Sequence, residues 1–238
     1  MSGKDYRKLC QTQHRVLEIL QPVLGNFYLT GGTALGRFYL NHRYSEDLDF
    51  FINQSDSFKT VAGNCRQLLS SNFQLITDQS LVYDDFIRFY LEEDDCILKI
   101  EFVNDIPYRS GSPIRYTYGL IDTPFNILSN KLGALVGRDE PKDIADILGI
   151  STHYRFNWVN IFKESREKCM VNELDVEQRL KSFPGSLLQT IDWIHPPDQS
   201  DSITRKLEIL ADDFLLGRDN SLGMDMPPIE EAVPQFLF

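Results

Sequence analysis

The sequence contains little cysteine and histidine, with four of each among 238 residues. The cysteines form no C-x-x-C pair, and the histidines are equally dispersed. Because structural zinc sites and disulfide frameworks use closely spaced ligands, this spacing argues against both. Reduced thiols in a cytoplasm fit the usage best. The residues concerned are Cys10, Cys65, Cys96, Cys169, His14, His42, His153 and His195.

Long apolar runs are missing as well. No run approaches the roughly 20 residues that a membrane-spanning helix needs. The N-terminal residues Met1–Asp5 lead into an amphipathic helix and not into the apolar segment of a secretory signal. We therefore expect a cytoplasmic protein with no membrane partner.

Basic residues are outnumbered, since 24 Lys and Arg against 35 Asp and Glu give a formal net charge of −11. This balance argues against a protein that grips nucleic acid over its whole surface, but it leaves room for a local basic groove. The chain is long enough for a catalytic domain with a smaller appendage.

The most informative stretch begins with a short apolar run, Phe27–Leu29, which predicts a strand. Gly31 and Gly32 follow, and they predict a tight turn where the backbone comes close to another group. The segment Thr33–Leu40 is compatible with a helix that has Thr33 near its start. The order is therefore strand, glycine turn and helix.

Two carboxylates follow within a second apolar run. Asp47 and Asp49 lie two residues apart, so on a strand they project from the same face, while Leu48 and Phe50 point into a core. Neighbouring carboxylates on a half-buried strand repel each other unless a cation lies between them. Mg²⁺ suits that place because it takes oxygen ligands and bridges to phosphates, and Mn²⁺ is the alternative ion.

Two better-known phosphate-binding patterns do not fit this stretch. Gly31 and Gly36 have the outer spacing of a P-loop, but Arg37 and Phe38 stand where Lys and Ser or Thr are required. The dinucleotide fingerprint G-x-G-x-x-G is missing too.

Alternation and helical spacing predict an α+β fold, with a small mixed sheet flanked by helices and a helical C-terminal lobe. The first domain is residues 1–121 and the second is residues 122–238, which completes a cleft. In the first domain we expect helices at 5–20 and 58–71, strands at 73–77, 85–92 and 96–103, and a further strand within 113–119. After residue 151 we expect helices around 158–162, 175–183, 187–194 and 203–216.

The start of the second domain carries a second charged pattern. Thr123 and Pro124 predict a helix start, and Lys131 lies near the apolar seam of that helix. A lysine at such a place is unusual without a partner. Asp143 and Asp146, three residues apart, fall on one face of the next helix.

Gly31–Leu35 and Arg43–Phe51 together resemble the nucleotidyltransferase superfamily typified by DNA polymerase beta, and more narrowly the AbiEii/AbiGii toxin family. That family's pattern reads roughly G-G-T-A-L followed by R-x-S-x-D-[IL]-D-F. The resemblance is dense over Tyr28–Ile52, returns near Asn126–Leu148, and is not found after Ser151. In the second region the family has a K…R…[RK]-D-x-x-D succession, in which Lys142 stands where arginine is more usual.

The resemblance implies a role for each matching residue. Metal would be held by Asp47, Asp49 and a third carboxylate, Glu101, for which a solvated edge-strand glutamate beside Lys99 is the alternative. The nucleotide triphosphate would be bound by Gly31, Gly32, Thr33, Arg43, Ser45 and Lys131. The catalytic set would be Asp47, Asp49, Lys131 and Asp146, the last orienting or deprotonating the acceptor. Further candidates are Arg138, Lys142 and Asp143.

The expected function is metal-dependent transfer of a nucleoside monophosphate from a nucleoside triphosphate to an acceptor hydroxyl. The resemblance favours RNA, notably tRNA, as the acceptor, and a toxin–antitoxin or phage-defence context with a cognate antitoxin. One alternative is a small-molecule nucleotidyltransferase of the antibiotic-modifying kind. Another is a catalytically silent nucleotide-binding partner protein, against which the repulsive pair Asp47 and Asp49 argues.

Overall fold

The computed structural model describes residues 5–138, 140–197 and 200–237. The predicted N-terminal lead, Met1–Lys4, and the last residue, Phe238, lie outside these ranges. Within them a seven-stranded sheet has the order β3-β4-β5-β2-β1-β7-β6. The strands are β1 (Tyr28–Thr30), β2 (Asp47–Asn53), β3 (Gln74–Val82), β4 (Phe86–Glu93), β5 (Cys96–Asp105), β6 (Ile114–Tyr116) and β7 (Gly119–Ile121).

The sheet is mixed, as the sequence predicts. Strand β2 pairs antiparallel with β1 and parallel with β5, and β1 pairs parallel with β7. The hairpin between β4 and β5 turns at Asp94 and Asp95, which both have positive φ, of 49° and 64°. Two-residue hairpin turns need this conformation, and Asp tolerates it. Where one further strand was expected within 113–119, the chain forms the two short strands β6 and β7.

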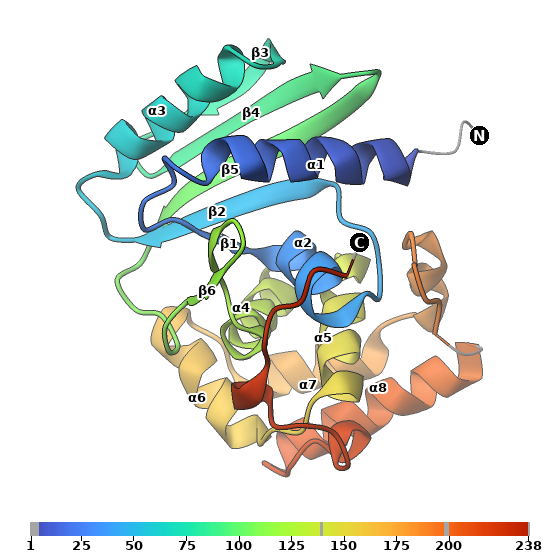
Figure 1. Cartoon of the computed structure of the whole chain (residues 1–238). Helices are drawn as coiled ribbons and strands as arrows, with labels where there is room; N and C mark the ends of the chain where they lie inside the picture. Colours follow the sequence, from blue (N-terminus) through green and yellow to red (C-terminus); the bar gives the residue numbers. More distant parts are fainter. Residues whose placement is uncertain (1–4, 139, 198–199, 238) are drawn as a thin grey trace.

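One face of the sheet is covered by α1 (Tyr6–Leu20) and α3 (Phe58–Ser70), as Figure 1 shows. The Asp5 side chain caps α1 by accepting hydrogen bonds from two backbone N–H groups. Aromatic rings fill the space between the layers, and Phe50 stacks on Phe102 with centroids 5.2 Å apart. Residues of β2 alternate between this core and the opposite face. The opposite face is therefore the one that presents Asp47 and Asp49.

The predicted helix Thr33–Leu40 differs in detail. Strand β1 runs directly into α2 (Gly31–Leu35), which continues as a five-residue π-helix, η1 (Gly36–Leu40). Asn41, at φ 52°, ends it. Such π turns are rare and local, so helical periodicity does not distinguish them from an α-helix.

The part of the chain after β7 is helical and lies below the sheet in Figure 1. Its α-helices are α4 (Pro124–Gly137), α5 (Pro141–His153), α6 (Trp158–Lys168), α7 (Glu173–Ser182) and α8 (Ser200–Leu215). Its 3₁₀ helices are η2 (Gly185–Thr190), η3 (Ser221–Gly223) and η4 (Ile229–Glu231). The predicted helix 187–194 is wrong, because the chain there forms only η2, which directly follows Pro184.

The C-terminal segment packs back on the first half of the chain. The backbone N–H of Gln235 donates to the Phe38 carbonyl at 2.7 Å, and that of Leu237 donates to the Arg37 carbonyl at 3.1 Å. The division of the chain between residues 121 and 122 stays a prediction. In the described ranges no helix has the length and apolarity to cross a bilayer.

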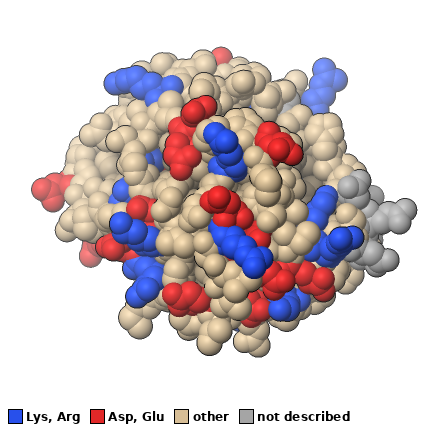
Figure 2. Space-filling view, turned by 90° about the horizontal axis from the view of Figure 1, so that it is seen from below, with Lys and Arg blue, Asp and Glu red and all other residues tan. Residues whose placement is uncertain are grey.

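The face seen from below, over the helical part, carries positive and negative side chains interspersed (Figure 2). Among the described residues of this face, no broad patch of one sign is visible. A site for a charged substrate is therefore to be sought in a cavity and not on this surface.

Candidate active site

A cavity of about 800 Å³ lies between the sheet and helices α4, α5 and α6. Its walls bring together residues from both regions that the sequence singled out. The predicted site residues that line it are Gly31, Gly32, Arg43, Ser45, Asp47, Asp49, Glu101, Lys131, Arg138, Lys142 and Asp143. Thr33 and Asp146 do not line it; both are fully buried.

The acidic wall is set by the register of β2 and β5. Asp49 lies opposite Glu101, and Asp47 lies opposite Lys99. The Asp49 Oδ1 atom is buried and has no hydrogen-bond partner among the described residues. Burial, then the charge of Asp47 and that of Glu101, raise the pKa of Asp49 to about 7. A buried carboxylate oxygen without a donor, beside two further acidic side chains, is costly, so the site favours a cation.

Basic side chains already touch this acidic wall. Lys99 Nζ lies 3.0 Å from Asp47 Oδ2 and 3.5 Å from Glu101 Oε1. Arg88 Nε donates to Glu101 Oε1 at 2.5 Å. Burial alone would raise the pKa of Glu101, but Lys99 and Arg88 outweigh it and lower that pKa. Glu101 is thus a neutralised member of the cluster, whereas Asp49 is not.

We asked whether these residues fit a divalent metal ion. In the described part of the chain, no group of three or more His, Cys, Asp or Glu side chains is arranged as a metal site. However, the buried Asp49 Oδ1 lacks a donor and Asp47 projects from the same face of β2. Two such carboxylates are the donor set that Mg²⁺ and Mn²⁺ prefer. The pair Asp47 and Asp49 therefore fits the ion. Among the described residues, the Asp47 carboxylate is at ion-pair distance from Lys99 alone, whereas Glu101 has such contacts with both Arg88 and Lys99.

The glycine turn is built against this wall. Gly31 has φ +71°, and a Cβ there would lie 2.8 Å from Asp49 Oδ2. A Cβ on Gly32 would lie 2.5 Å from Arg43 Nη2 and 2.8 Å from Ser45 Oγ. Both positions need glycine because the side chains of Asp49, Arg43 and Ser45 lie directly against the backbone.

Thr33 has a different place from the one the sequence suggested. Its hydroxyl donates to the backbone carbonyl of Asp47 and is fully buried. It therefore does not face the cavity, where a triphosphate would lie. Its contact ties the start of α2 to the first residue of β2, so Thr33 positions the acidic strand.

A buried ion network lies beneath the basic wall. Asp146 accepts from Arg43 Nε at 2.7 Å and from Arg43 Nη2 at 2.8 Å, and its Oδ2 lies 2.7 Å from Lys131 Nζ. His42 Nε2 lies 2.9 Å from Asp146 Oδ1. Burial would raise the pKa of Asp146, but Arg43 and Lys131 hold it well below its ordinary value. Such a carboxylate is a poor proton acceptor, and its contacts hold the Arg43 and Lys131 side chains in place.

The second aspartate completes the network. Asp143 Oδ1 lies 2.7 Å from Lys131 Nζ, and Asp143 Oδ2 accepts from Arg138 Nε at 2.8 Å. Burial lowers the pKa of His42, which keeps that ring neutral. Three cations, Arg43, Lys131 and Arg138, therefore face two carboxylates, which leaves a positive charge beside the cavity.

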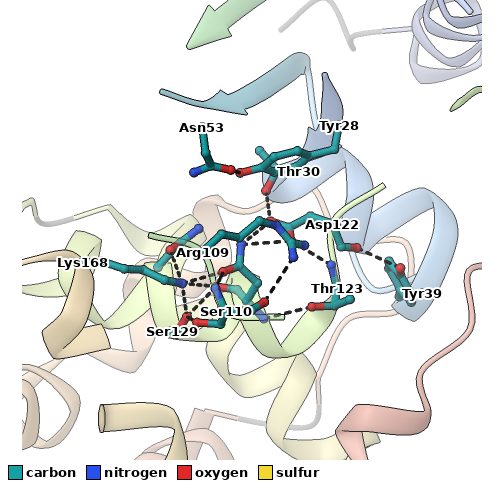
Figure 3. A network of polar contacts seen from close by, with 12 residues as sticks. Tyr28, Thr30, Tyr39, Asn53, Arg109, Ser110, Asp122, Thr123, Ser129 and Lys168 are labelled. Carbon is teal, nitrogen blue, oxygen red and sulfur yellow. Dashed lines mark hydrogen bonds and ion pairs between the residues drawn. The ribbon is translucent and has the colours of Figure 1, made fainter. Parts of the chain in front are cut away.

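The sequence reasoning missed Lys168, at the end of α6. Its ammonium donates to Asn126 Oδ1 at 2.6 Å, Ser129 Oγ at 2.5 Å and Asn130 Oδ1 at 2.8 Å (Figure 3). Burial lowers its pKa to about 8. Helical spacing could have found it, because Lys168 lies three residues after the buried Ser165, on the inward side of the helix.

The family model described as "Nucleotidyl transferase AbiEii toxin, Type IV TA system" matches residues 15–232. A search of curated protein sequences finds no match.

Among the solved structures that share the fold are one from Helicobacter pylori and one from Mycobacterium tuberculosis. The crystal structure of JHP933 from Helicobacter pylori is 19% identical, with a TM-score of 0.57 over 90% of this chain and 94% of that one. The nucleotidyltransferase toxin MenT4 from Mycobacterium tuberculosis is 15% identical, with a TM-score of 0.58 over 86% of this chain and 83% of that one. The α+β nucleotidyltransferase fold predicted from the sequence is thereby confirmed.

Proposed function

The chain belongs to the AbiEii nucleotidyl transferase toxin family, and on that premise we propose that it moves a nucleoside monophosphate from a nucleoside triphosphate to a hydroxyl of RNA, notably tRNA. One observation carries the proposal. The buried, donor-free oxygen of Asp49 lies beside Asp47 and against the glycine turn, on the wall of a cavity large enough for a nucleotide.

Asp47 and Asp49 would hold Mg²⁺, with Mn²⁺ as the alternative ion, and Glu101 is the third carboxylate of the cluster. When bound, the ion would supply positive charge to the reacting phosphates. Asp47 and Asp49 would contribute two carboxylate ligands from one face of strand β2. Lys99, which contacts both Asp47 and Glu101, would restrain their charge when no ion is bound.

The triphosphate would lie on the glycine turn and the basic wall. Backbone N–H groups of Gly31 and Gly32 can donate to phosphate oxygens, and Arg43 and Ser45 lie directly against that turn. Lys131 would stabilise the charge that develops on pyrophosphate. Asp143 and Asp146 hold these cations in place, and the exposed Arg138 and Lys142 stand at the rim of the cavity.

The family is a toxin family of a Type IV toxin–antitoxin system, which implies an antitoxin as a protein partner. A cytoplasmic place of action is part of the proposal, because the substrates are found there. The small-molecule alternative, with a cationic acceptor, is disfavoured by Arg138, Lys142 and Lys168 on the cavity wall. The silent alternative is disfavoured because a buried Asp49 Oδ1 without a donor destabilises the fold, and a protein that only binds nucleotide gains nothing from that cost.

The direct test incubates the purified chain with each α-labelled nucleoside triphosphate, total RNA and Mg²⁺. We expect label to enter RNA, and chelation of the metal to stop it. If no RNA species becomes labelled with any of the four nucleotides, the proposal is overturned. Label found only on an aminoglycoside-type small molecule would favour the first alternative.

A further inference from the structure

We propose that the end of the cavity at Lys168 is a second anion site, which binds a phosphate of the acceptor strand and not the triphosphate. The inference rests on the proposed function, since it names how that same site receives its acceptor. No role for Lys168 follows from the family motifs, which are not found after Ser151.

The first argument is that the Lys168 ammonium has only neutral partners. Its hydrogen bonds go to Asn126, Ser129 and Asn130, all on α4. Within the described ranges no carboxylate lies at ion-pair distance from it. The other two half-buried or buried lysines of the cavity are paired: Lys99 with Asp47, and Lys131 with Asp143 and Asp146.

Lys168 is half-buried, and a half-buried cation with no carboxylate in direct contact is stabilised by an anionic ligand. Three carboxylates, those of Asp122, Glu164 and Asp105, favour the charged form of Lys168 and Arg109 opposes it, but among the described residues none of the three is at ion-pair distance from the ammonium. Asp122 is already used by Thr30, Arg109 and Asn126, while Arg109 itself is positive. The Glu164 carboxylate accepts from the Tyr108 hydroxyl at 2.6 Å. Asp105 accepts from its neighbour's backbone N–H at 2.9 Å.

The second argument is that the site around Lys168 is rigid. Asn126 donates to both carboxylate oxygens of Asp122, at 3.0 and 2.9 Å, and accepts from the Ser110 N–H at 3.0 Å. Thr30, the last residue of β1, donates to Asp122 at 2.6 Å. Figure 3 shows that this network joins β1, the β5–β6 connection, α4 and α6. The ammonium is thus preorganised at the wall of the cavity.

The third argument is position. Arg43 and Ser45 precede β2, and Gly31 follows β1, which is antiparallel to β2. The residues proposed to bind the triphosphate therefore lie near the start of β2. Lys168 and Asp105 are close enough for their charges to interact, and Asp105 lies at the far end of β5, opposite Asn53 at the end of β2. From Glu101 to Asp105 is four strand residues, about 13 Å.

The acidic cluster of Asp47, Asp49 and Glu101 therefore lies between the residues proposed to bind the triphosphate and the end of the cavity at Lys168. In phosphoryl transfer the attacking and leaving oxygens are roughly in line, on opposite sides of the transferred group. With pyrophosphate leaving toward Arg43, the acceptor approaches from the opposite side. An anion needed there belongs to the acceptor, which fits a phosphodiester strand and does not fit a cationic small molecule.

The test measures binding and does not depend on transfer. A short, fluorescently labelled single-stranded RNA with a free 3′ hydroxyl is titrated with wild type, K168Q, K168R and the control K163Q, whose lysine is exposed on the same helix. Loss of one phosphate contact should make the slope of log affinity against log salt shallower by about 0.7 in K168Q. K168R and K163Q should keep the wild-type slope, and nucleoside triphosphate affinity should stay within about twofold in every variant.

An unchanged slope in K168Q, or an equal loss of nucleoside triphosphate affinity, would overturn the inference. If K168Q does not fold, the comparison of K168R with wild type across pH decides. RNA binding by wild type should weaken as pH rises past about 8, while binding by K168R should not, because arginine keeps its charge. Identical pH profiles would overturn the inference. A changed slope together with no RNA labelling by wild type would instead reject the proposed function alone.

Discussion

Gly31 and Asp49 are in such close contact that a Cβ on the glycine would lie 2.8 Å from the carboxylate oxygen Oδ2. The turn that would bind phosphates and the carboxylate that would hold the metal are therefore one unit. In the proposed reaction metal and triphosphate would meet at this point, and the contact explains why a side chain is excluded from it.

Gly31→Ala tests this unit. The substitution is strained at φ +71° and pushes on Asp49, so we expect a loss of about 1–2 kcal/mol of stability and a loss of activity of at least about tenfold. Gly25→Ala is the matched control, because Gly25 has φ +58° but nothing within 4 Å of the added Cβ. The control should lose similar stability and keep its activity. Equal activity in both variants, measured with melting curves alongside, would contradict the account.

Lys131→Ala tests the basic wall. The variant removes phosphate neutralisation and leaves Asp143 and Asp146 without one partner, so affinity for nucleoside triphosphate, transfer rate and stability should all fall. The expected stability loss is about 3–5 kcal/mol, measured by urea unfolding. If the folded variant keeps nucleotide affinity and turnover within twofold, Lys131 is a structural lysine only.

Asp146→Asn separates positioning from base catalysis. The carboxylate holds Arg43 and Lys131 and does not reach the cavity, so its loss should weaken nucleotide binding and leave the shape of the pH–rate profile unchanged. The opposite result is normal nucleotide binding together with a pH–rate profile that no longer rises with the deprotonation of a basic group. That result would show that Asp146 is the proton acceptor.

Stability without metal should depend on pH through Asp49. Its folded pKa of about 7 lies above its ordinary value of 3.8, so the folded state binds the proton more tightly. The stability contributed by the protonated form is lost as pH rises from about 4 to about 7, by at most about 4 kcal/mol. Asp49→Asn lacks this loss, so its advantage over wild type should grow through that window and then stay level. A difference that does not vary with pH, in denaturant titrations at several pH values, would refute the assignment.

Residues whose placement depends on local periodicity could be predicted from the sequence. Strand alternation placed Asp47 and Asp49 on one face, and it placed Glu101 with Lys99 on one face of β5. The start of α4 followed from Thr123 and Pro124. In each case the deciding interactions lie within a few residues along the chain.

Residues whose role depends on distant partners could not be assigned. Asp146 is fully buried, and its partner Arg43 is 103 residues away along the chain. Thr33 lies at a predicted helix start, but its partner is the carbonyl of Asp47, on another element. Lys168 contacts α4, 38 or more residues earlier. Helical spacing shows that such residues face inward and does not show what they meet.

The most direct test of the central claim compares transfer of labelled nucleoside monophosphate to RNA, in the presence of Mg²⁺, by wild type, Asp49→Asn and the control Asp56→Asn. Asp56 is an exposed acid outside the cavity. We predict that Asp49→Asn loses about a hundredfold or more in rate, with its fold intact by melting, while Asp56→Asn matches wild type. Wild-type rates in Asp49→Asn would contradict the claim that this carboxylate holds the metal for nucleotidyl transfer.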